Sequence, residues 1–211
     1  MFTGLITATA TLTAVTPLGS DALHGKRVTL RLTDPGWLQG VQTGDSIAVS
    51  GACMTVAALH ADGFSFDVSA ESLARTTGLD AAGTLVNLEQ SVSLATRLGG
   101  HLVTGHVDGV GRVHAFEPAG ESWRLDIDTP AELGRFFAYK GSIAVNGVSL
   151  TVNRVQDLPD ACRVSINLIP HTLQHTNLHQ LRAGAAVNLE VDLIARYVAR
   201  MLQAPHGAGD V

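Results

Sequence analysis

An eleven-residue stretch occurs twice in this chain. It reads SIAVSGACMTV at residues 46–56 and SIAVNGVSLTV at residues 142–152, so seven of the eleven positions are identical and the offset is 142 − 46 = 96 residues. Other matching blocks keep the same order: AGTLVNLE at 82–89 corresponds to AGAAVNLE at 183–190. A period of about 100 residues is too long for a solenoid unit and close to a common domain size. We therefore predict two copies of one domain.

Each copy has the sequence pattern of β structure. Apolar and polar residues alternate in SIAV, VSLTV, FSFDV and RVSIN, and the 22 glycines suit many short strands joined by tight turns. Asn146-Gly147 predicts a two-residue type I′ hairpin turn, and Ser50-Gly51 is a weaker version of it. About six strands per copy indicate a small antiparallel barrel, closed or nearly closed. We place the two barrels at residues 1–97 and 98–190.

The composition limits the partners. The 211 residues are 45% hydrophobic and 16% charged, with a net charge of −5 and no cluster of Lys or Arg, which disfavours nucleic acid and membranes as partners. No apolar run approaches the ~18 residues of a membrane span, and the start lacks a signal peptide. Cys53 and Cys162 stand at non-equivalent places in the repeat, so no disulfide framework is expected. We expect a cytoplasmic protein.

The duplicated hairpin carries polar groups on one face. Side chains at i and i+2 of a strand share a face, so Ser149 and Thr151 lie opposite the apolar set around Leu150. Cys53 and Thr55 are the corresponding pair of the first repeat. A single pair of this kind is most simply a solvent-facing strand surface. The same pair at equivalent places in both repeats favours a binding site.

Several longer motifs resemble one enzyme family. MFTGLI, SGACMTV, NGVSLTV, GGHLVTGHVDGVG, YKGSIAV and INLIPHTL together resemble the riboflavin synthases, whose chains contain two lumazine-binding repeats, and the similarity runs from Met1 to about Met201. The resemblance implies an all-β fold of two tandem six-stranded Greek-key barrels followed by a C-terminal α-helix. It implies a transferase that dismutates two molecules of 6,7-dimethyl-8-ribityllumazine. One molecule gives a four-carbon unit to the other, which yields riboflavin and 5-amino-6-(D-ribitylamino)uracil without a cofactor or a metal.

A non-catalytic lumazine- or flavin-binding protein of the same fold is the alternative. The intact Ser149-Leu150-Thr151 disfavours it, because non-catalytic relatives tend to lose this motif. Two identical substrates held face to face suit two related half-sites, and unequal roles of donor and acceptor require a chemical difference between them. Cys53 against Ser149 is one such difference, and Gly44 against Lys140 is another. Holding two reactants in register supplies roughly 7–11 kcal/mol of a barrier.

The resemblance also implies substrate-binding residues in both repeats, with Phe2 suited to stacking on a flat heterocycle. In the first repeat they are Phe2, Gly4, Leu5, Ile6, Ser46, Cys53, Met54, Thr55, Asp67, Val68, Ser69, Ala70, Glu71 and Ser72. In the second repeat they are Gly105, His106, Val107, Lys140, Ser149, Leu150, Thr151, Asn167, Leu168, Ile169, Pro170, His171 and Thr172.

The implied chemistry needs a base for the C7 methyl group of the lumazine and an acid for the departing amine. His106 is the best candidate, because histidine changes charge near neutral pH. We expect a dyad of His106 with Ser149, with Thr151 beside it and Cys53 assisting in the other half-site.

Three further histidines have the spacing of a helical stripe. His171, His175 and His179 are four residues apart and on one helix would form a face capable of binding zinc. Pro170 before them and Asn177 within them weaken a helix, and no fourth ligand is evident. We expect no metal site.

The C-terminus belongs to neither repeat. Residues 191–204 have apolar side chains at helical spacing, with Arg196 and Arg200 on the polar side, and residues 205–211 are expected to form a loose tail. The apolar set is Val191, Ile194, Val198, Met201 and Leu202. This stripe either docks on its own barrel or packs against other copies. The resemblance implies a homotrimer in which the first repeat of one subunit faces the second repeat of a neighbour.

Overall fold

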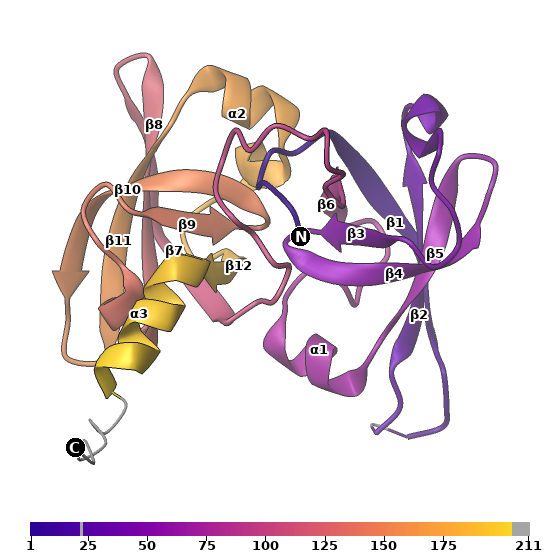
Figure 1. The fold of residues 1–211 in the computed structure, drawn as a ribbon, viewed down its shortest axis with the longest axis horizontal. Helices are drawn as coiled ribbons and strands as arrows, with labels where there is room; N and C mark the ends of the chain where they lie inside the picture. Colours follow the sequence, from indigo (N-terminus) through magenta and orange to yellow (C-terminus); the bar gives the residue numbers. More distant parts are fainter. Residues whose placement is uncertain (22, 204–211) are drawn as a thin grey trace, which may run out of the picture.

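The computed structural model describes residues 1–21 and 23–203 and consists of two closed six-stranded barrels that lie side by side (Figure 1). The first barrel contains β1 (Ala8–Pro17), β2 (Lys26–Leu32), β3 (Ser46–Val49), β4 (Ala52–Leu59), β5 (Gly63–Val68) and β6 (Leu85–Gln90). The second contains β7 (Gly109–Ala119), β8 (Ser122–Pro130), β9 (Ser142–Val145), β10 (Val148–Asp157), β11 (Ala161–Leu168) and β12 (Ala186–Val191). The predicted all-β fold of two tandem barrels is confirmed.

Both barrels have the same topology. Neighbouring strands follow the order β1-β2-β5-β4-β3-β6 in the first barrel. The second barrel repeats this order with each strand number raised by six, and its strands also pair antiparallel. Pairing of β2 with β5, across the intervening hairpin, gives the Greek-key connection. The sequence repeat is therefore a duplication of a whole barrel.

The duplicated stretch forms the β3–β4 and β9–β10 hairpins. Asn146 and Gly147 have φ angles of 47° and 80°, the positive values that a type I′ turn needs at both central residues. Ser50 and Gly51, with φ of 43° and 86°, make the same turn in the first barrel. The two turns touch, because a Cβ added at Gly51 would lie 2.8 Å from the backbone nitrogen of Gly147. The hairpin tips thus meet where the barrels join.

Alternation along the hairpins places the apolar side chains in the barrel cores. Leu150 and Val152 are buried, whereas Ser149 is half-buried and Thr151 is exposed. Each barrel has its own hydrophobic cluster, and the repeated apolar positions of the hairpins belong to these clusters. The polar face predicted from the period-2 pattern therefore points away from the core.

Asparagine side chains join the two barrels through buried hydrogen bonds. Asn87 in β6 donates to the carbonyl of Asn146 at 2.9 Å, and Asn188 in β12 donates to the carbonyl of Ser50 at 2.9 Å. The backbone nitrogen of Asn177 donates to Oδ1 of Asn87 at 2.6 Å. Because buried polar groups are costly to leave unpaired, this network fixes the orientation of one barrel against the other.

Short helices connect the strands, and one longer helix ends the described chain. The helices are η1 (Pro35–Leu38), α1 (Ala70–Arg75), η2 (Ala131–Phe136), α2 (Pro170–His175), η3 (Asn177–Gln180) and α3 (Leu193–Gln203). Helix α3 begins two residues later than the sequence pattern suggested, because Val191 is the last residue of β12 and is buried in the barrel core. The expected tail at 205–211 lies outside the described residues. None of the described helices is long and apolar enough to cross a membrane.

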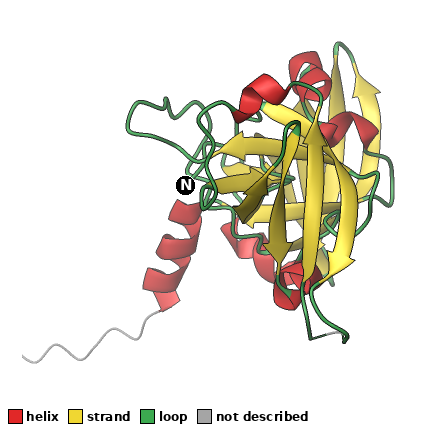
Figure 2. Cartoon of the chain, turned by 90° about the vertical axis from the view of Figure 1, so that its right-hand side faces the viewer, coloured by secondary structure: helices red, strands yellow, loops and turns green. Residues whose placement is uncertain are grey.

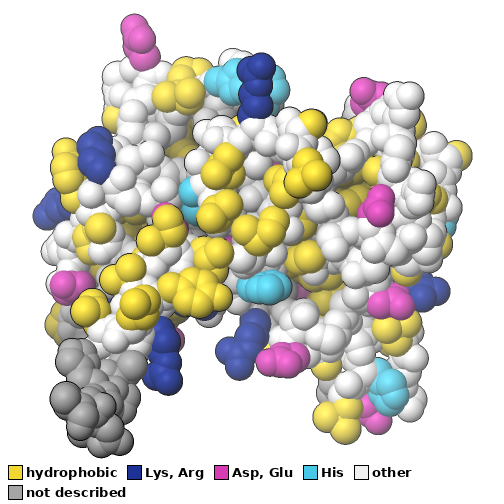
Figure 3. All heavy atoms as spheres, viewed as in Figure 1, with side chains coloured by type: hydrophobic (Ala, Val, Ile, Leu, Met, Phe, Trp, Pro, Cys, Tyr) yellow, Lys and Arg dark blue, Asp and Glu magenta, His cyan; other side chains and the backbone are white. Residues whose placement is uncertain are grey.

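Helix α3 projects from the second barrel (Figure 2). The first turn of the helix is held to the barrel by an ion pair, in which the guanidinium of Arg196 lies 2.7 Å from the carboxylate of Asp108. The apolar side chains of the helix are exposed in this chain and add to the hydrophobic side chains gathered on the face shown in Figure 3. They are Ile194, Tyr197, Val198, Met201 and Leu202.

Candidate functional site

The segment that opens each repeat reaches the hairpin of the opposite barrel. The carbonyl of Gly4 accepts a hydrogen bond from the backbone nitrogen of Ser149 at 2.8 Å, and the carbonyl of Gly105 accepts one from Cys53 at 2.8 Å. The structure therefore brings candidate residues of the two repeats together across the two barrels. Residues 4–6 lie with Ser149, and residues 105–107 lie with Cys53. Figure 1 shows the N-terminus between the two barrels, where this exchange occurs.

Glycine is required at the two places where these segments contact the opposite hairpins. Gly4 and Gly105 have φ angles of 76° and 80°, in the left-handed region that L side chains rarely adopt. A Cβ added at Gly4 would lie 2.6 Å from Cβ of Ser149, and one at Gly105 would lie 2.6 Å from Cβ of Cys53. The backbone of each segment can approach its hairpin this closely because no side chain stands between them.

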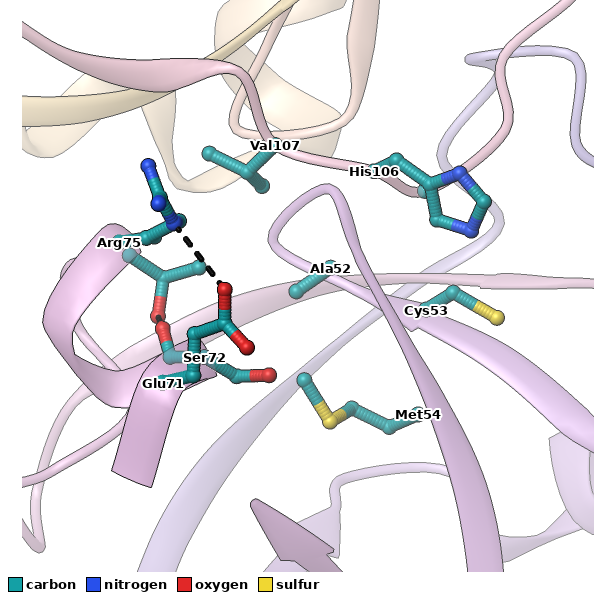
Figure 4. Close-up of a pocket in the computed structure, with 10 residues that line it drawn as sticks. Ala52, Cys53, Met54, Glu71, Ser72, Arg75, His106 and Val107 are labelled. Carbon is teal, nitrogen blue, oxygen red and sulfur yellow. Dashed lines mark hydrogen bonds and ion pairs between the residues drawn. The ribbon is translucent and has the colours of Figure 1, made fainter. Parts of the chain in front are cut away.

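We call the pocket around Cys53 half-site one. Its volume is about 210 Å³. Figure 4 shows the His106 ring and the Cys53 thiol extending in the same direction along its wall. The pocket is lined by Ala52, Cys53, Met54, Glu71, Ser72, Arg75, Thr76, Gly105, His106 and Val107. The pocket therefore brings together seven candidate residues, four from the first repeat and three from the second. They are Cys53, Met54, Glu71, Ser72, Gly105, His106 and Val107.

Arg75 is a lining residue that the sequence reasoning missed. Its guanidinium lies 3.5 Å from the carboxylate of Glu71, one turn earlier on α1. The i,i+4 spacing of these two charges was a usable signal, since the candidate stretch already included Glu71. Arg75 brings a positive charge to the rim of half-site one.

Other candidates from the first repeat support the pocket from outside its lining. Asp67 forms two hydrogen bonds with Arg27, at 2.7 and 2.9 Å, and these lower the pKa of its carboxyl. Ser69 caps α1 by accepting from the backbone nitrogen of Ser72 at 3.0 Å, and Ala70 begins that helix. Val68 is fully buried in the core.

Ser46 and Thr55 face each other in the register of β3 and β4. Phe2 is 1% exposed and packs in a small cluster with Val103, Ala144 and Cys53. Its backbone bridges that of Val103, with a nitrogen-to-oxygen distance of 2.7 Å. The ring of Phe2 thus packs behind Cys53 and has no face open to solvent within one chain.

The second hairpin carries a different polar pair. The hydroxyl of Ser149 lies 2.7 Å from Nδ1 of His101. His101 is buried, and its burial lowers the pKa of the imidazole, so the ring is neutral at pH 7. A Cβ added at Gly100 would lie 2.8 Å from Cβ of Ser149, which brings the histidine segment close. Within one chain Ser149 bonds to His101 and His106 lies beside Cys53, so the expected His106–Ser149 dyad does not form there and stays a prediction for a site shared between copies.

His101 is the second residue that the sequence reasoning missed. Gly105 corresponds to Gly4, so the counterpart of His101 would precede Met1. A comparison of the two repeats therefore could not reveal it. The signal that was available is its place in the motif GGHLVTGHVDGVG, which the chain shares with the resembling family.

A second cleft lies beside α2, where the equivalent of half-site one is expected. Its volume is about 250 Å³, and it is lined by Ile6, Thr7, Ala8, Thr9, Gln174, His175, Thr176 and His179. Ile6 corresponds to Val107 and His175 to Arg75, so this cleft repeats the α1 side of half-site one. Together with Gly4, His101 and Ser149 we call it half-site two.

Candidates from the end of β11 lie around the start of α2. The side-chain oxygen of Asn167 accepts from the hydroxyl of Ser122 at 2.8 Å, and Leu168 is fully buried. Ile169 is exposed and is followed by α2, which holds Pro170, His171 and Thr172. Lys140 stands on the loop before β9, where its ammonium donates to Asn153 at 2.9 Å.

The histidine stripe does not lie on one helix. Helix α2 ends at His175, and His179 belongs to η3. The His175 and His179 rings donate from Nδ1 to the carbonyls of His171 and Thr176, at 2.8 and 2.7 Å. Among residues 1–21 and 23–203, no three side chains of metal-binding type are grouped to hold an ion.

Comparison with known proteins places both barrels in one family. Residues 3–91 and 104–192 each match the lumazine binding domain. The riboflavin synthase of Photobacterium phosphoreum is 39% identical over 204 residues, which cover 96% of this chain and 89% of that protein. The riboflavin synthase of Mycobacterium bovis is 42% identical over 208 residues, which cover 96% of this chain and 98% of that protein.

A solved structure is similar over most of the chain. LumP complexed with 6,7-dimethyl-8-(1'-D-ribityl) lumazine superposes with a TM-score of 0.77 and 25% identity, covering 90% of this chain and 99% of that one. LumP complexed with riboflavin gives the same TM-score at 26% identity. The duplicated barrels and the sequence relatives agree, and the chain belongs to the riboflavin synthase family of proteins with two lumazine binding domains.

Proposed function

We propose that this protein forms riboflavin by dismutating two molecules of 6,7-dimethyl-8-ribityllumazine. One observation carries the proposal: the fold presents two equivalent half-sites whose polar groups differ, with Cys53 and His106 in one and Ser149 and His101 in the other. A reaction between two identical molecules needs two similar sites. Their different roles as donor and acceptor need two unequal ones.

The reaction balances without another reactant. A four-carbon unit leaves one lumazine and joins the second, so the products are riboflavin and 5-amino-6-(D-ribitylamino)uracil. The atoms of two substrates equal the atoms of the two products, and no electron acceptor is consumed. Proton transfers and the alignment of the two rings are the tasks left to the protein.

His106 is the proposed proton acceptor in half-site one. It is exposed at the pocket wall, next to the hairpin carrying Cys53. We expect it to take a proton from the C7 methyl group of a bound lumazine. In half-site two the neutral His101 can accept the hydroxyl proton of Ser149 at Nδ1 and so orient that oxygen toward a ligand. Thr151 shares the outward face with Ser149 and is proposed to bind the same ligand.

We propose that the working site combines half-site one of one copy with half-site two of another, in a homotrimer. The two half-site pockets of one chain, at about 210 and 250 Å³, fall below the roughly 300–1,000 Å³ typical of ligand sites. Each is therefore expected to need a second surface to enclose its ligand. The exposed apolar side chains of α3 supply a means of association, because a helix normally buries such a stripe. The two free cysteines suit the cytoplasmic location expected from the sequence.

The test is to incubate the purified protein with 6,7-dimethyl-8-ribityllumazine and separate the products by chromatography. Riboflavin and the ribitylaminouracil should form in equal amounts, in the presence of excess EDTA as in its absence. Tight binding of the lumazine without riboflavin formation would favour the alternative, a binding protein like LumP, and would contradict the proposal.

A further inference from the structure

A buried glutamate lies behind each of the two segments that reach the hairpin of the opposite barrel, residues 3–5 and residues 104–106. Glu89 in β6 is 4% exposed, and Glu190 in β12 is 3% exposed. Within residues 1–21 and 23–203, neither carboxylate forms an ion pair with a Lys, Arg or His side chain. Both side chains lie against the backbone of the segments that enter the half-sites. Their role therefore follows from the hydrogen bonds that they make to those segments.

The carboxylate of Glu190 gathers four donors from one short segment. Oε1 accepts from the backbone nitrogen and the hydroxyl of Thr104, at 2.6 and 2.7 Å. Oε2 accepts from the backbone nitrogens of Gly105 and His106, at 2.9 and 3.1 Å. Charged acceptors make the stronger hydrogen bonds, and these four converge on the turn that precedes the His106 side chain.

Glu89 makes a similar but smaller set of contacts. It accepts from the backbone nitrogen and the hydroxyl of Thr3, both at 2.6 Å, and from the backbone nitrogen of Gly4 at 2.9 Å. The next nitrogen, that of Leu5, donates to the hydroxyl of Thr3 at 3.2 Å. The two carboxylates thus make equivalent contacts, with one exception. Glu190 also accepts from the backbone nitrogen of His106, whereas Glu89 does not accept from that of Leu5, the corresponding residue.

From these contacts we propose that Glu190 is a positioning residue for half-site one and Glu89 for half-site two. The inference rests on the proposed function, because it assigns these residues to the same two half-sites. Glu190 fixes the peptide groups that carry His106, and the carbonyl of Gly105 in turn accepts from the backbone nitrogen of Cys53. One carboxylate therefore sets where the His106 ring stands relative to the opposite barrel.

A carboxylate is required at this place. The four donors need acceptors at both oxygens, whereas a glutamine presents one oxygen and one NH₂ group. In Glu190→Gln the NH₂ group would face backbone N–H donors at one of the two positions. The segment must then shift away from the hairpin, although the volume of the side chain is unchanged.

The test is a double-mutant cycle. Single-turnover rates of riboflavin formation are measured for Glu190→Gln, for His106→Gln and for the pair, with dissociation constants for riboflavin measured in parallel. Glu190→Gln should lower the rate by roughly tenfold or more, the loss expected for charged hydrogen bonds. In the His106→Gln background the same change should lower it less than about twofold, because groups that act through one another are not additive.

Glu89→Gln is the matched control. It removes the equivalent carboxylate from the other segment, so its effect should be about the same factor with or without His106→Gln. Full additivity of Glu190→Gln with His106→Gln would overturn the proposal, because it would mean a general loss of stability rather than an action through His106. If Glu190→Gln does not fold, Glu190→Asp keeps the charge but withdraws it by one methylene, and the same non-additivity is expected.

The cycle remains informative if the proposed reaction fails. A parent protein that binds riboflavin but forms none would refute the proposed function. The dissociation constants would then carry the test: non-additive losses of affinity support positioning by Glu190, and additive losses refute it.

Discussion

The hydroxyl of Ser149 lies 2.7 Å from Nδ1 of His101, while its counterpart Cys53 lies beside the exposed His106. The duplicated hairpin therefore offers two chemically different groups at equivalent places. A hydroxyl bonded to a buried neutral imidazole is oriented, whereas a thiol is a weak donor and acceptor.

Exchanging these two groups should have unequal effects. Ser149→Cys replaces the hydroxyl that bonds to His101 and should slow single-turnover formation of riboflavin about two- to tenfold, since one lost hydrogen bond costs about 0.5–1.5 kcal/mol. Cys53→Ser keeps a donor of similar size and should mainly change the affinity for the lumazine. Rapid-quench kinetics and a fluorescence titration measure the two quantities. Equal loss of rate in both variants would argue against unequal half-sites.

Burial of His101 gives the protein a pH-dependent stability. Burial lowers the pKa of its imidazole below the value of about 6.5 in an unfolded chain. The unfolded state then takes up the proton first, so the free energy of unfolding should fall as the pH drops below about 6.5 toward the lower folded pKa. Burial raises the pKa of the Glu89 and Glu190 carboxyl groups, so the folded state takes up these protons first and their contribution to the free energy of unfolding has the opposite sign, rising as the pH falls.

Urea unfolding at a series of pH values between about 5.5 and 7.5 tests this linkage. His101→Gln should flatten the dependence in that range, because glutamine does not titrate. A parent protein whose unfolding free energy does not change there would show that the His101 ring is not held neutral.

Because Ser149 lies so close to Gly4, an alanine at position 4 should lower the free energy of unfolding more than an alanine at another glycine of similar conformation. Gly83 has a φ of 87° and no other atom within 4 Å of an added Cβ, so Gly83→Ala should cost only the left-handed strain of about 1–2 kcal/mol. Gly4→Ala adds a clash with the backbone nitrogen of Ser149 at 2.8 Å. Unfolding in urea should therefore show a larger loss for Gly4→Ala. Similar losses would mean that the segment moves aside freely.

Helix α3 should determine the oligomeric state. Ile194 is 64% exposed on the apolar side, and Ile194→Glu should shift the protein toward monomers in sedimentation velocity runs. Arg200→Glu, on the polar side of the same helix, is the matched control and should leave the oligomer intact. An unchanged oligomer in both variants would place the association surface elsewhere.

Much of the fold could be predicted because turn residues, the alternation of apolar and polar side chains, and the sequence repeat are all local features of the sequence. Asn146-Gly147 forms the predicted turn because both residues tolerate positive φ, and Leu150 is buried because side chains alternate along a strand. Val191 was misplaced because an apolar residue between a strand and a helix fits either pattern.

The site was only partly predictable, for a physical reason. Most of the residues of half-site one were named, but the crossing of Gly4 and Gly105 to the opposite hairpins depends on contacts between the barrels. Such long-range contacts leave no periodic signal in the sequence. Arg75 and His101 were missed because their roles follow from what lies beside them in space.

The central claim is that one working site takes half-site one from one copy of the chain and half-site two from another. The direct measurement mixes His106→Gln and Ser149→Ala chains, each alone expected to be much slower than the parent, after dissociation and joint refolding. In mixed oligomers about one quarter of the subunit contacts pair two intact half-sites, so riboflavin formation should recover toward that fraction of the parent rate. If the mixture is no more active than its two components, each site lies within a single chain and the account is wrong.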